Sequence, residues 1–434
     1  MKKIGLYTLG CKVSQYETEA IGEEFERRGY EISSFDSVCD AYVINTCTVT
    51  AESDRKSRQI IRRAVTKNPD AVVAVVGCYS QLAPGDLLKI DGVDVVMGTD
   101  KKLEVVDRVE FLLKNGREKS FCEIYSVDDA LFEPMSITKA PRTRAYVKIE
   151  DGCESKCTYC AISPARGRVR SKLPEDVIAE VEGLYKNGTK EIVLTGIETG
   201  SYGRDFDFEY GLGDLIVELD KRRSCERIRL GSLAPELIGK QFVDKVKDAK
   251  ILAPHFHLSI QSGSDKILRA MKRRYSREMA LRNIQYIKDN IPGACFTTDL
   301  MVGFPGETEE DFLDTVSFVK TVGFIDAHVF AYSRRSGTPA ATYDGQIPES
   351  EKKRRSRSLI EIKNEVRELV LDGITERGDT LSVILETYDS LYYTAHSEGF
   401  AEVKVEASEG LQGEMVLVKP VSHKDGVIYG KLIN

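Results

Sequence analysis

The sequence predicts an α/β protein of three units: an N-terminal open parallel α/β domain, a central partial (β/α)6 barrel and a C-terminal small antiparallel β-barrel. Strand-like and helix-like segments alternate as far as about residue 370, which is typical of parallel sheets covered by helices. Cys153, Cys157 and Cys160 form a C-x3-C-x2-C loop directly after one of these strands. From Asp379 onward, short strands with glycine turns replace the alternation.

Composition indicates a globular protein of two or three domains. The chain has 434 residues, of which 30% are charged and 41% hydrophobic. We expect no membrane span and a cytoplasmic location, because no apolar run is long enough and residues 1–7 lack a signal-peptide core. Ten cysteines in such a chain favour metal or redox chemistry over disulfides. The net charge of −7 argues against bulk attraction to nucleic acid, so only local basic patches are expected to bind it.

Residues 1–125 are expected to form the first domain. Apolar segments bounded by polar helical patterns predict four strands, at 4–8, 41–45, 71–76 and 93–97. Helical periodicity predicts helices at 16–28 and 53–66. This alternation indicates a parallel sheet with helices on its faces.

Three cysteines of this domain occupy equivalent places. Cys11, Cys47 and Cys78 each follow one of the first three predicted strands. Because the carboxyl ends of parallel strands meet at one edge, the three thiols are expected to converge on a metal cluster. The alternative is that they only pack, which is the role we expect for the remaining cysteines outside the loop: Cys39, Cys122, Cys225 and Cys295.

A linker is expected at 126–143, because this stretch carries two prolines and little periodicity. The central domain, 144–370, then carries the cysteine loop. Three thiolates hold three irons of a four-iron cluster and leave the fourth iron open for a ligand. The alternative is a zinc site, which would need a fourth Cys or His nearby, and the nearest downstream histidine is His255.

The pattern predicts six β/α units in the central domain, too few to close an eight-stranded barrel. The expected strands are 145–149, 191–195, 227–230, 255–260, 296–302 and 327–332. The expected helices are 174–186, 212–221, 235–247, 265–271, 276–289 and 307–322. An incomplete barrel has a lateral opening that suits a large substrate. Polar residues near the strand ends are candidates for binding a small ligand there: Thr195, Gly196, Glu198, Arg229, Ser259 and Gln261.

A charged helix at 349–371 is expected to lead into the third domain, 371–434. Five short strands are predicted there, at 381–386, 392–395, 401–405, 415–421 and 426–432. This domain has no cysteine and only scattered histidines, so it is expected to bind a partner rather than to perform chemistry.

The whole chain resembles the methylthiotransferase family of radical S-adenosylmethionine (SAM) enzymes. Beside the cysteine loop, four motifs carry this resemblance: Thr8-Leu-Gly-Cys-Lys-Val-Ser-Gln-Tyr-Glu17, Asn45-Thr-Cys-Thr-Val-Thr50, Asp54-Arg-Lys-Ser-Arg58 and Gly77-Cys-Tyr79. The resemblance implies a methylthiotransferase domain, a radical SAM core and an RNA-binding TRAM domain. It is closest to the branch that modifies N6-threonylcarbamoyladenosine at position 37 of tRNA. Three positions depart from the family pattern: Ser14, Glu198 and Ala234.

The resemblance implies two [4Fe-4S] clusters, on Cys153, Cys157 and Cys160 and on Cys11, Cys47 and Cys78. The first would cleave SAM to a 5′-deoxyadenosyl radical, and the second would carry the sulfur. SAM would contact the strand-end residues named above. The implied partners are the anticodon stem-loop of tRNA, an electron donor such as a flavodoxin or ferredoxin, and a sulfur source.

Local basic patches are expected to bind the RNA. Arg55, Arg58 and Arg62 share one helix face just beyond Cys47. Residues 272–274 and 334–335 are further candidates, whereas 352–355 is read as a solvated helix face. Alternatives to the threonylcarbamoyladenosine reaction are methylthiolation of another tRNA adenosine or of a ribosomal protein aspartate, and a non-catalytic iron–sulfur RNA-binding protein.

Overall fold

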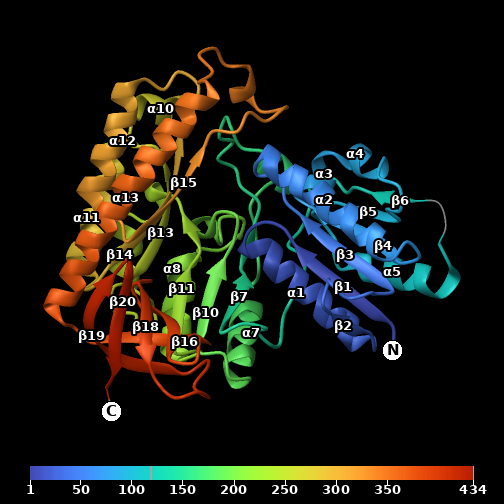
Figure 1. Cartoon of the computed structure of the whole chain (residues 1–434), viewed down its shortest axis with the longest axis horizontal. Coiled ribbons are helices and arrows are strands. Elements are labelled where there is room, and N and C mark those ends of the chain that lie inside the picture. The colour runs from blue at the N-terminus through green and yellow to red at the C-terminus, as the bar shows by residue number, and fades with distance from the viewer. Residues whose placement is uncertain (118–119, 434) are drawn as a thin grey trace.

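The computed structural model describes residues 1–117 and 120–433. The N-terminal unit lies beside the central unit, and the C-terminal barrel lies below the central unit (Figure 1). No helix of the described ranges is both long and apolar enough to cross a membrane.

The N-terminal unit is a parallel sheet with the strand order β2-β1-β3-β4-β5-β6. Its strands are β1 (Lys3–Thr8), β2 (Glu31–Ser33), β3 (Ala41–Thr46), β4 (Val72–Gly77), β5 (Val95–Met97) and β6 (Phe121–Glu123). The four predicted strands are present. The prediction omitted β2 and β6, because three residues are too few to show a period.

Helices cover both faces of this sheet. They are α1 (Lys12–Arg27), α2 (Ala51–Lys67), α3 (Cys78–Leu82), α4 (Pro84–Leu88) and α5 (Glu104–Asn115). One apolar core joins the sheet to α1 and α5, and another joins its opposite face to α2 and α4. The helix α1 begins four residues earlier than predicted, directly after Cys11.

The central unit is an incomplete barrel of parallel strands. Its strands are β7 (Arg144–Lys148), β10 (Glu191–Thr195), β11 (Arg227–Leu230), β12 (Ser232–Leu233), β13 (His255–Gln261), β14 (Cys295–Val302) and β15 (Asp326–Ala331). They form two sheets, ordered β11-β10-β7 and β12-β13-β14-β15. Since only Gly231 separates β11 from β12, the two serve as one barrel strand, and the six predicted strands are all present.

Helices surround the outside of this barrel. They are α7 (Pro174–Lys186), α8 (Leu212–Arg222), α9 (Lys240–Val246), α10 (Asp265–Ala270), α11 (Arg277–Asn290), α12 (Glu309–Val322) and α13 (Glu349–Arg377). The prediction of one helix over 235–247 was wrong. A 3-10 turn (Pro235–Leu237) precedes α9, because Gly239 has an extended backbone and caps the new helix. The helix α13 runs six residues beyond its predicted end and stops at Gly378, whose φ is +61°.

The C-terminal unit is a closed barrel of five strands, as predicted. Its strands are β16 (Leu381–Tyr388), β17 (Tyr392–Ser397), β18 (Glu402–Glu406), β19 (Met415–Lys424) and β20 (Val427–Leu432). One pair, β18 and β20, is parallel, because a ring of five strands cannot alternate in direction throughout. The segment 126–143 has no helix or strand, although its Met135 and Ile137 are buried in the central core.

Candidate active site

The cysteine loop connects β8 (Glu150–Asp151) to α6 (Ile162–Arg166) at the carboxyl end of β7. Gly152 starts the loop with φ +88°, and a Cβ there would lie 1.8 Å from the carbonyl oxygen of Arg168. The loop lines a cavity of about 390 Å³ together with residues 337 and 339. The three loop cysteines therefore line one cavity.

Hydrogen-bond donors already point at the loop sulfurs. The backbone N–H of Ile162 donates to Sγ of Cys160 at 3.3 Å, and Arg273 donates to Sγ of Cys157 at 3.4 Å. Burial raises the pKa of Cys153 to about 11. A metal would therefore have to stabilise the thiolate of Cys153, because burial alone favours the neutral thiol.

Cys11, Cys47 and Cys78 lie at the carboxyl edge of the N-terminal sheet. Cys11 precedes α1, Cys47 follows β3 and Cys78 begins α3. A Cβ at Gly10 would lie 3.5 Å from Sγ of Cys47, so the β1 turn passes close to this thiol. Burial, with smaller contributions from Cys78 and Cys11, raises the pKa of Cys47 to about 11. The three thiols are thus close enough to act on one another electrostatically.

Three thiols at each site form a donor set that an iron–sulfur cluster could use. Among the described residues, no three His, Cys, Asp or Glu side chains are arranged to hold a single metal ion. A four-iron cluster makes no such demand, since each cysteine binds a different iron and the sulfurs stay apart. Thiolates are also the ligands that iron–sulfur clusters use.

A buried charge cluster separates the two cysteine sites. Arg166, at the end of α6, lies within 2.6 Å of Glu17 of α1 and 3.0 Å of Asp151. Lys102 and Lys148 also pair with Glu17. Although burial opposes ionisation, these cations hold the pKa of Glu17 below its ordinary range. The sequence pattern did not indicate this cluster, although Glu17 lies on the buried face of α1 and so needed a buried cation.

Two carboxyl groups approach the glycine turn after β10. The carboxylate of Glu150 accepts the backbone N–H of Glu198 at 3.0 Å, and a Cβ at Gly196 would lie 2.3 Å from that carboxylate. Glu198 accepts the N–H of Ala234 at 2.9 Å. Burial raises the pKa of Glu198 to about 7, and backbone hydrogen bonds oppose the shift. The charge of Glu198 in turn acts on Cys153, so this turn lies beside the cysteine loop.

Several buried polar atoms at this end of the barrel lack a protein partner. Within residues 1–117 and 120–433 they include Glu150 Oε1, Thr199 Oγ1 and Gln261 Oε1. Gln261 also has φ +66°, a conformation that side chains rarely adopt. Such atoms usually bind a ligand or water, so the strand ends fit a polar ligand such as SAM.

Comparisons with known proteins agree with this geometry. Residues 147–319 match the radical SAM superfamily, and residues 3–98 match the uncharacterized protein family UPF0004. The threonylcarbamoyladenosine tRNA methylthiotransferase MtaB of Bacillus subtilis is 38% identical over 96% of this chain and 94% of its own length. The chain belongs to the methylthiotransferase family of radical SAM enzymes.

Two further relatives and one solved structure are also similar to this chain. The MtaB protein of Aquifex aeolicus is 37% identical over 92% of this chain and 98% of its own length. The tRNA-2-methylthio-N(6)-dimethylallyladenosine synthase of Bacillus mycoides is 33% identical over 100% of this chain and 86% of its own length. The radical SAM methyltransferase TsrM of Kitasatospora setae has a similar fold, with a TM-score of 0.56 at 18% identity over 79% of this chain and 77% of its own.

As a radical SAM methylthiotransferase, the enzyme uses SAM and a [4Fe-4S] cluster. The predicted SAM contact at Arg229 was nevertheless wrong. Arg229 pairs with Glu191, the first residue of β10, and donates to the carbonyls of Ser397 and Glu398 at 3.1 and 3.0 Å. Its guanidinium therefore lies at the amino end of the strands, opposite the cysteine loop. There it joins the barrel to the C-terminal unit, where Phe400 stacks on His255 at 4.6 Å.

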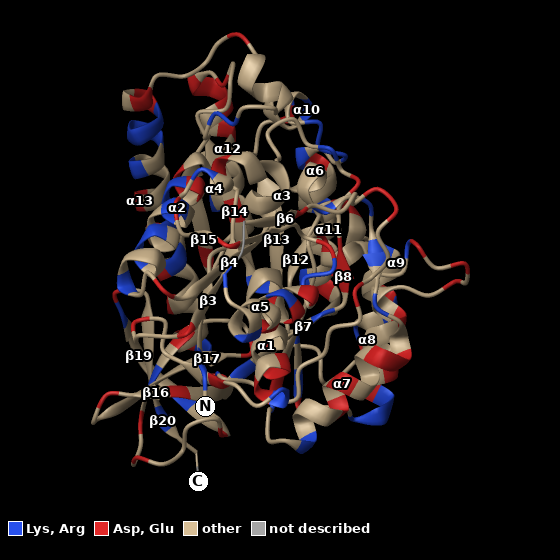
Figure 2. Ribbon diagram, turned by 90° about the vertical axis from the view of Figure 1, so that its right-hand side faces the viewer, with Lys and Arg blue, Asp and Glu red and all other residues tan. Residues whose placement is uncertain are grey.

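The predicted RNA-binding arginines lie on α2, whose ribbon carries several Lys and Arg positions (Figure 2). Arg62 is exposed, and exposed Arg55 pairs with Glu52. Arg58 is half-buried and donates to the hydroxyl of Tyr79 at 2.7 Å, next to Cys78.

Two other basic side chains have structural partners instead. Arg273 contacts the Cys157 sulfur, and Arg335 pairs with Asp54 across the two units. The prediction of a solvated helix face at 352–355 was wrong in part, because Lys352 and Arg355 are buried. Cys122 was also predicted to be a packing residue, but it is exposed.

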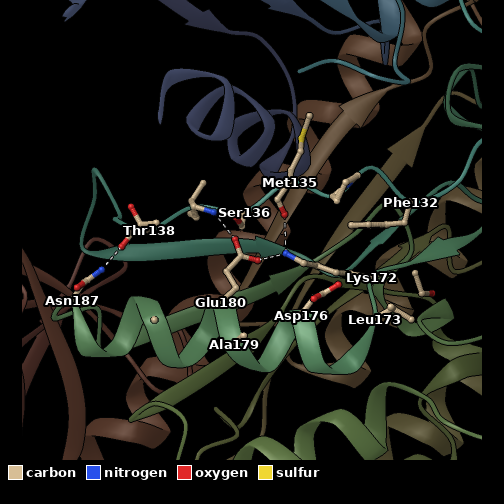
Figure 3. Close-up of a pocket in the computed structure, with 14 residues that line it drawn as sticks. Phe132, Met135, Ser136, Thr138, Lys172, Leu173, Asp176, Ala179, Glu180 and Asn187 are labelled. Atoms are coloured by element: carbon tan, nitrogen blue, oxygen red, sulfur yellow. Dashed lines mark hydrogen bonds and ion pairs between the residues drawn. The ribbon is translucent and has the colours of Figure 1, made fainter. Parts of the chain in front are cut away.

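A cavity of about 580 Å³ lies elsewhere, between the linker and α7 (Figure 3). Three of its polar side chains, Lys172, Glu180 and Asn187, are already paired. Lys172 pairs with Glu180 and donates to the carbonyl of Met135 at 2.8 Å, while the amide of Asn187 donates to the carbonyl of Thr138 at 2.7 Å. These contacts attach the linker to the barrel at this cavity. The residues suited to catalysis lie at the cysteine sites instead.

Proposed function

We propose that this enzyme adds a methylthio group to C2 of N6-threonylcarbamoyladenosine at position 37 of tRNA. The observation that carries the proposal is the match to proteins named threonylcarbamoyladenosine tRNA methylthiotransferase, at 37–38% identity over 91–96% of this chain. Proteins named for the dimethylallyl nucleoside match at 32–34%. That nucleoside is the second candidate substrate.

The inside of the barrel supports the threonylcarbamoyl nucleoside. Asp299 lies 3.3 Å from His257 and 3.4 Å from His328, and both histidines come from neighbouring strands. Lys12, directly after Cys11, is close enough to Asp299 and Arg229 for their charges to act on its pKa. A polar interior suits the polar threonylcarbamoyl group better than the apolar dimethylallyl group.

We assign the radical SAM cluster to Cys153, Cys157 and Cys160, and a second, auxiliary cluster to Cys11, Cys47 and Cys78. When bound, these clusters and SAM supply the radical and sulfur chemistry. The turn of Thr195, Gly196 and Glu198, with Ser259 and Gln261, would orient SAM beside the loop. We propose functional units at 1–125 and 144–370, joined by the linker 126–143, and a tRNA-binding TRAM domain at 371–434.

The test is an anaerobic reaction followed by mass spectrometry of nucleosides. Reconstituted enzyme, SAM, a chemical reductant in place of the flavodoxin or ferredoxin, and a sulfide source are incubated with tRNA that bears threonylcarbamoyladenosine. A parallel reaction uses tRNA that bears dimethylallyladenosine. We expect a methylthio mass gain on the threonylcarbamoyl nucleoside alone.

Other results would each change the proposal. A gain only on the dimethylallyl nucleoside would replace the substrate and keep the chemistry. SAM cleavage to deoxyadenosine without any nucleoside product would contradict both tRNA substrates. Such a result would direct the search to a ribosomal protein aspartate.

A further inference from the structure

Arg166 contacts a cysteine of the N-terminal site and a carboxylate just before the cysteine loop. It is fully buried, and its Nε lies 3.3 Å from Sγ of Cys78 in the N-terminal unit. Its Nη1 lies 3.0 Å from Asp151, two residues before Cys153. Because α6 follows the cysteine loop directly, one guanidinium connects the loop to a ligand of the other site.

The charges around Arg166 leave an excess of positive charge. Four buried cations lie here: Arg166, Lys102, Lys148 and Arg170. They face the carboxylates of Glu17 and Asp151. Burial raises the pKa of Glu133, the third carboxyl near Lys148, and lowers the pKa of Lys102, so that Arg166, Lys148 and Arg170 still outnumber the two carboxylates. A buried excess of cations is costly unless an anion compensates it, and thiolates on an iron–sulfur cluster are such an anion.

We propose that Arg166 is a positioning residue that holds Cys78 for the auxiliary cluster and raises the reduction potential of that cluster. The inference rests on the proposed assignment of Cys11, Cys47 and Cys78 as its ligands. A hydrogen bond and a positive charge at a ligand sulfur stabilise the more negative, reduced cluster. The same guanidinium fixes the position of Cys78 relative to the loop through Asp151.

The arginine beside each cysteine site has partners in different parts of the chain. Arg273 donates to Cys157 and also to the carbonyl of Ser259, within the central unit. Arg166 spans the two units, with Glu17 and Cys78 on one side and Asp151 on the other. Arg166 is therefore the residue whose removal should change the auxiliary site without a direct effect on the loop sulfurs.

The test measures the midpoint potential of the auxiliary cluster by a redox titration followed by electron paramagnetic resonance. The full-length chain carries Cys153→Ala, Cys157→Ala and Cys160→Ala, so that the signal comes from one cluster. Arg166→Gln and Arg166→Lys are compared with Lys148→Met. The control removes a cation that pairs with Glu17 and Asp151 in the same buried cluster, without a recorded contact to Cys78.

We expect Arg166→Gln to lower the reduced-to-oxidised ratio at a fixed potential about tenfold, which is ~59 mV for one electron. Arg166→Lys should shift the potential less, because it keeps the charge, and Lys148→Met should shift it least. Loss of iron from the Arg166 variants alone would also support the inference. An unchanged potential in Arg166→Gln, or an equal effect of Lys148→Met on potential or iron content, would overturn it.

The proposed function fails by a different result. If the parent chain with the three loop substitutions binds no iron, the auxiliary cluster itself is absent and both proposals are overturned. If the cluster is loaded but its midpoint potential is the same in the Arg166 variants as in the parent chain, only the inference about Arg166 is overturned. Iron analysis of the parent chain therefore separates the two failures.

Discussion

The two cysteine sites are built in opposite ways. Cys153, Cys157 and Cys160 lie within eight residues, so one loop determines their spacing whatever the rest of the chain does. Cys11, Cys47 and Cys78 are separated by 36 and 31 residues, and only the register of β1, β3 and β4 brings them together. The first site depends on local sequence and the second on a folded parallel sheet.

This difference extends to the surroundings of the sulfurs. The loop borders an open cavity, where a small molecule can reach the cysteines. Cys78 is buried against Arg166, in a cluster of ion pairs shared by two domains. The auxiliary site should therefore be more sensitive to anything that loosens the contact between the domains.

The largest expected effect separates the chemistry of the two sites. Cys157→Ala should abolish SAM cleavage and product together, because the loop cluster would lose a ligand. Cys47→Ala should abolish the methylthio product while SAM is still cleaved to deoxyadenosine. Liquid chromatography of deoxyadenosine and nucleosides checks both, with Cys39→Ala as the control because Cys39 packs elsewhere in the same domain. Deoxyadenosine missing from Cys47→Ala would contradict the division of labour.

The next effect tests the buried contact between the domains. Glu17→Gln should lower the free energy of unfolding by about 3–5 kcal/mol, because Arg166, Lys102 and Lys148 lose their shared carboxylate. Glu52→Gln removes one partner of an exposed pair with Arg55 and should cost far less, because solvent screens this pair. Denaturant unfolding of both variants measures the difference, and equal costs would show that the buried network contributes nothing special.

The sequence predicted the positions of the cysteines, but not the charged residues that surround them. The cysteine spacing and the alternation of strands and helices predicted that both sets of cysteines follow strand ends, and the structure places them there. The cations around Glu17 were missed, because Lys102, Lys148 and Arg166 come from separate elements and only tertiary contact pairs them. Arg229 was misplaced for a related reason: a strand pattern does not show whether a long side chain extends toward the amino or the carboxyl end.

The loop site also predicts a pH dependence of stability. Burial raises the pKa of Glu198 to about 7, above its ordinary value of 4.5 in an unfolded chain. Folding then favours the protonated carboxyl, so this contribution to stability is complete below pH 4.5 and is lost as the pH rises through about 7. The loss amounts to about 3 kcal/mol at most.

Glu198→Gln should remove this dependence, because an amide cannot ionise. Unfolding free energies of the two proteins, measured in denaturant from pH 5 to pH 8, should therefore diverge in slope, with wild type losing more stability. Subtracting the two curves cancels the other buried carboxyls, Glu150 among them, whose pKa is also raised. Parallel curves would show that Glu198 does not titrate in this range.

The smallest expected effect concerns how tRNA reaches the auxiliary site. The helix α2 begins four residues after Cys47, and Arg62 on its exposed face has no hydrogen bond or ion pair within the described residues. If that face contacts phosphates, Arg62→Glu should weaken tRNA binding and lower the slope of log affinity against log salt by about one. Lys353→Glu, on exposed α13, is the matched charge reversal away from the cysteines and should leave the slope unchanged. Filter binding across salt concentrations measures both, and equal slopes for the two variants would mean that tRNA does not approach the auxiliary site across α2.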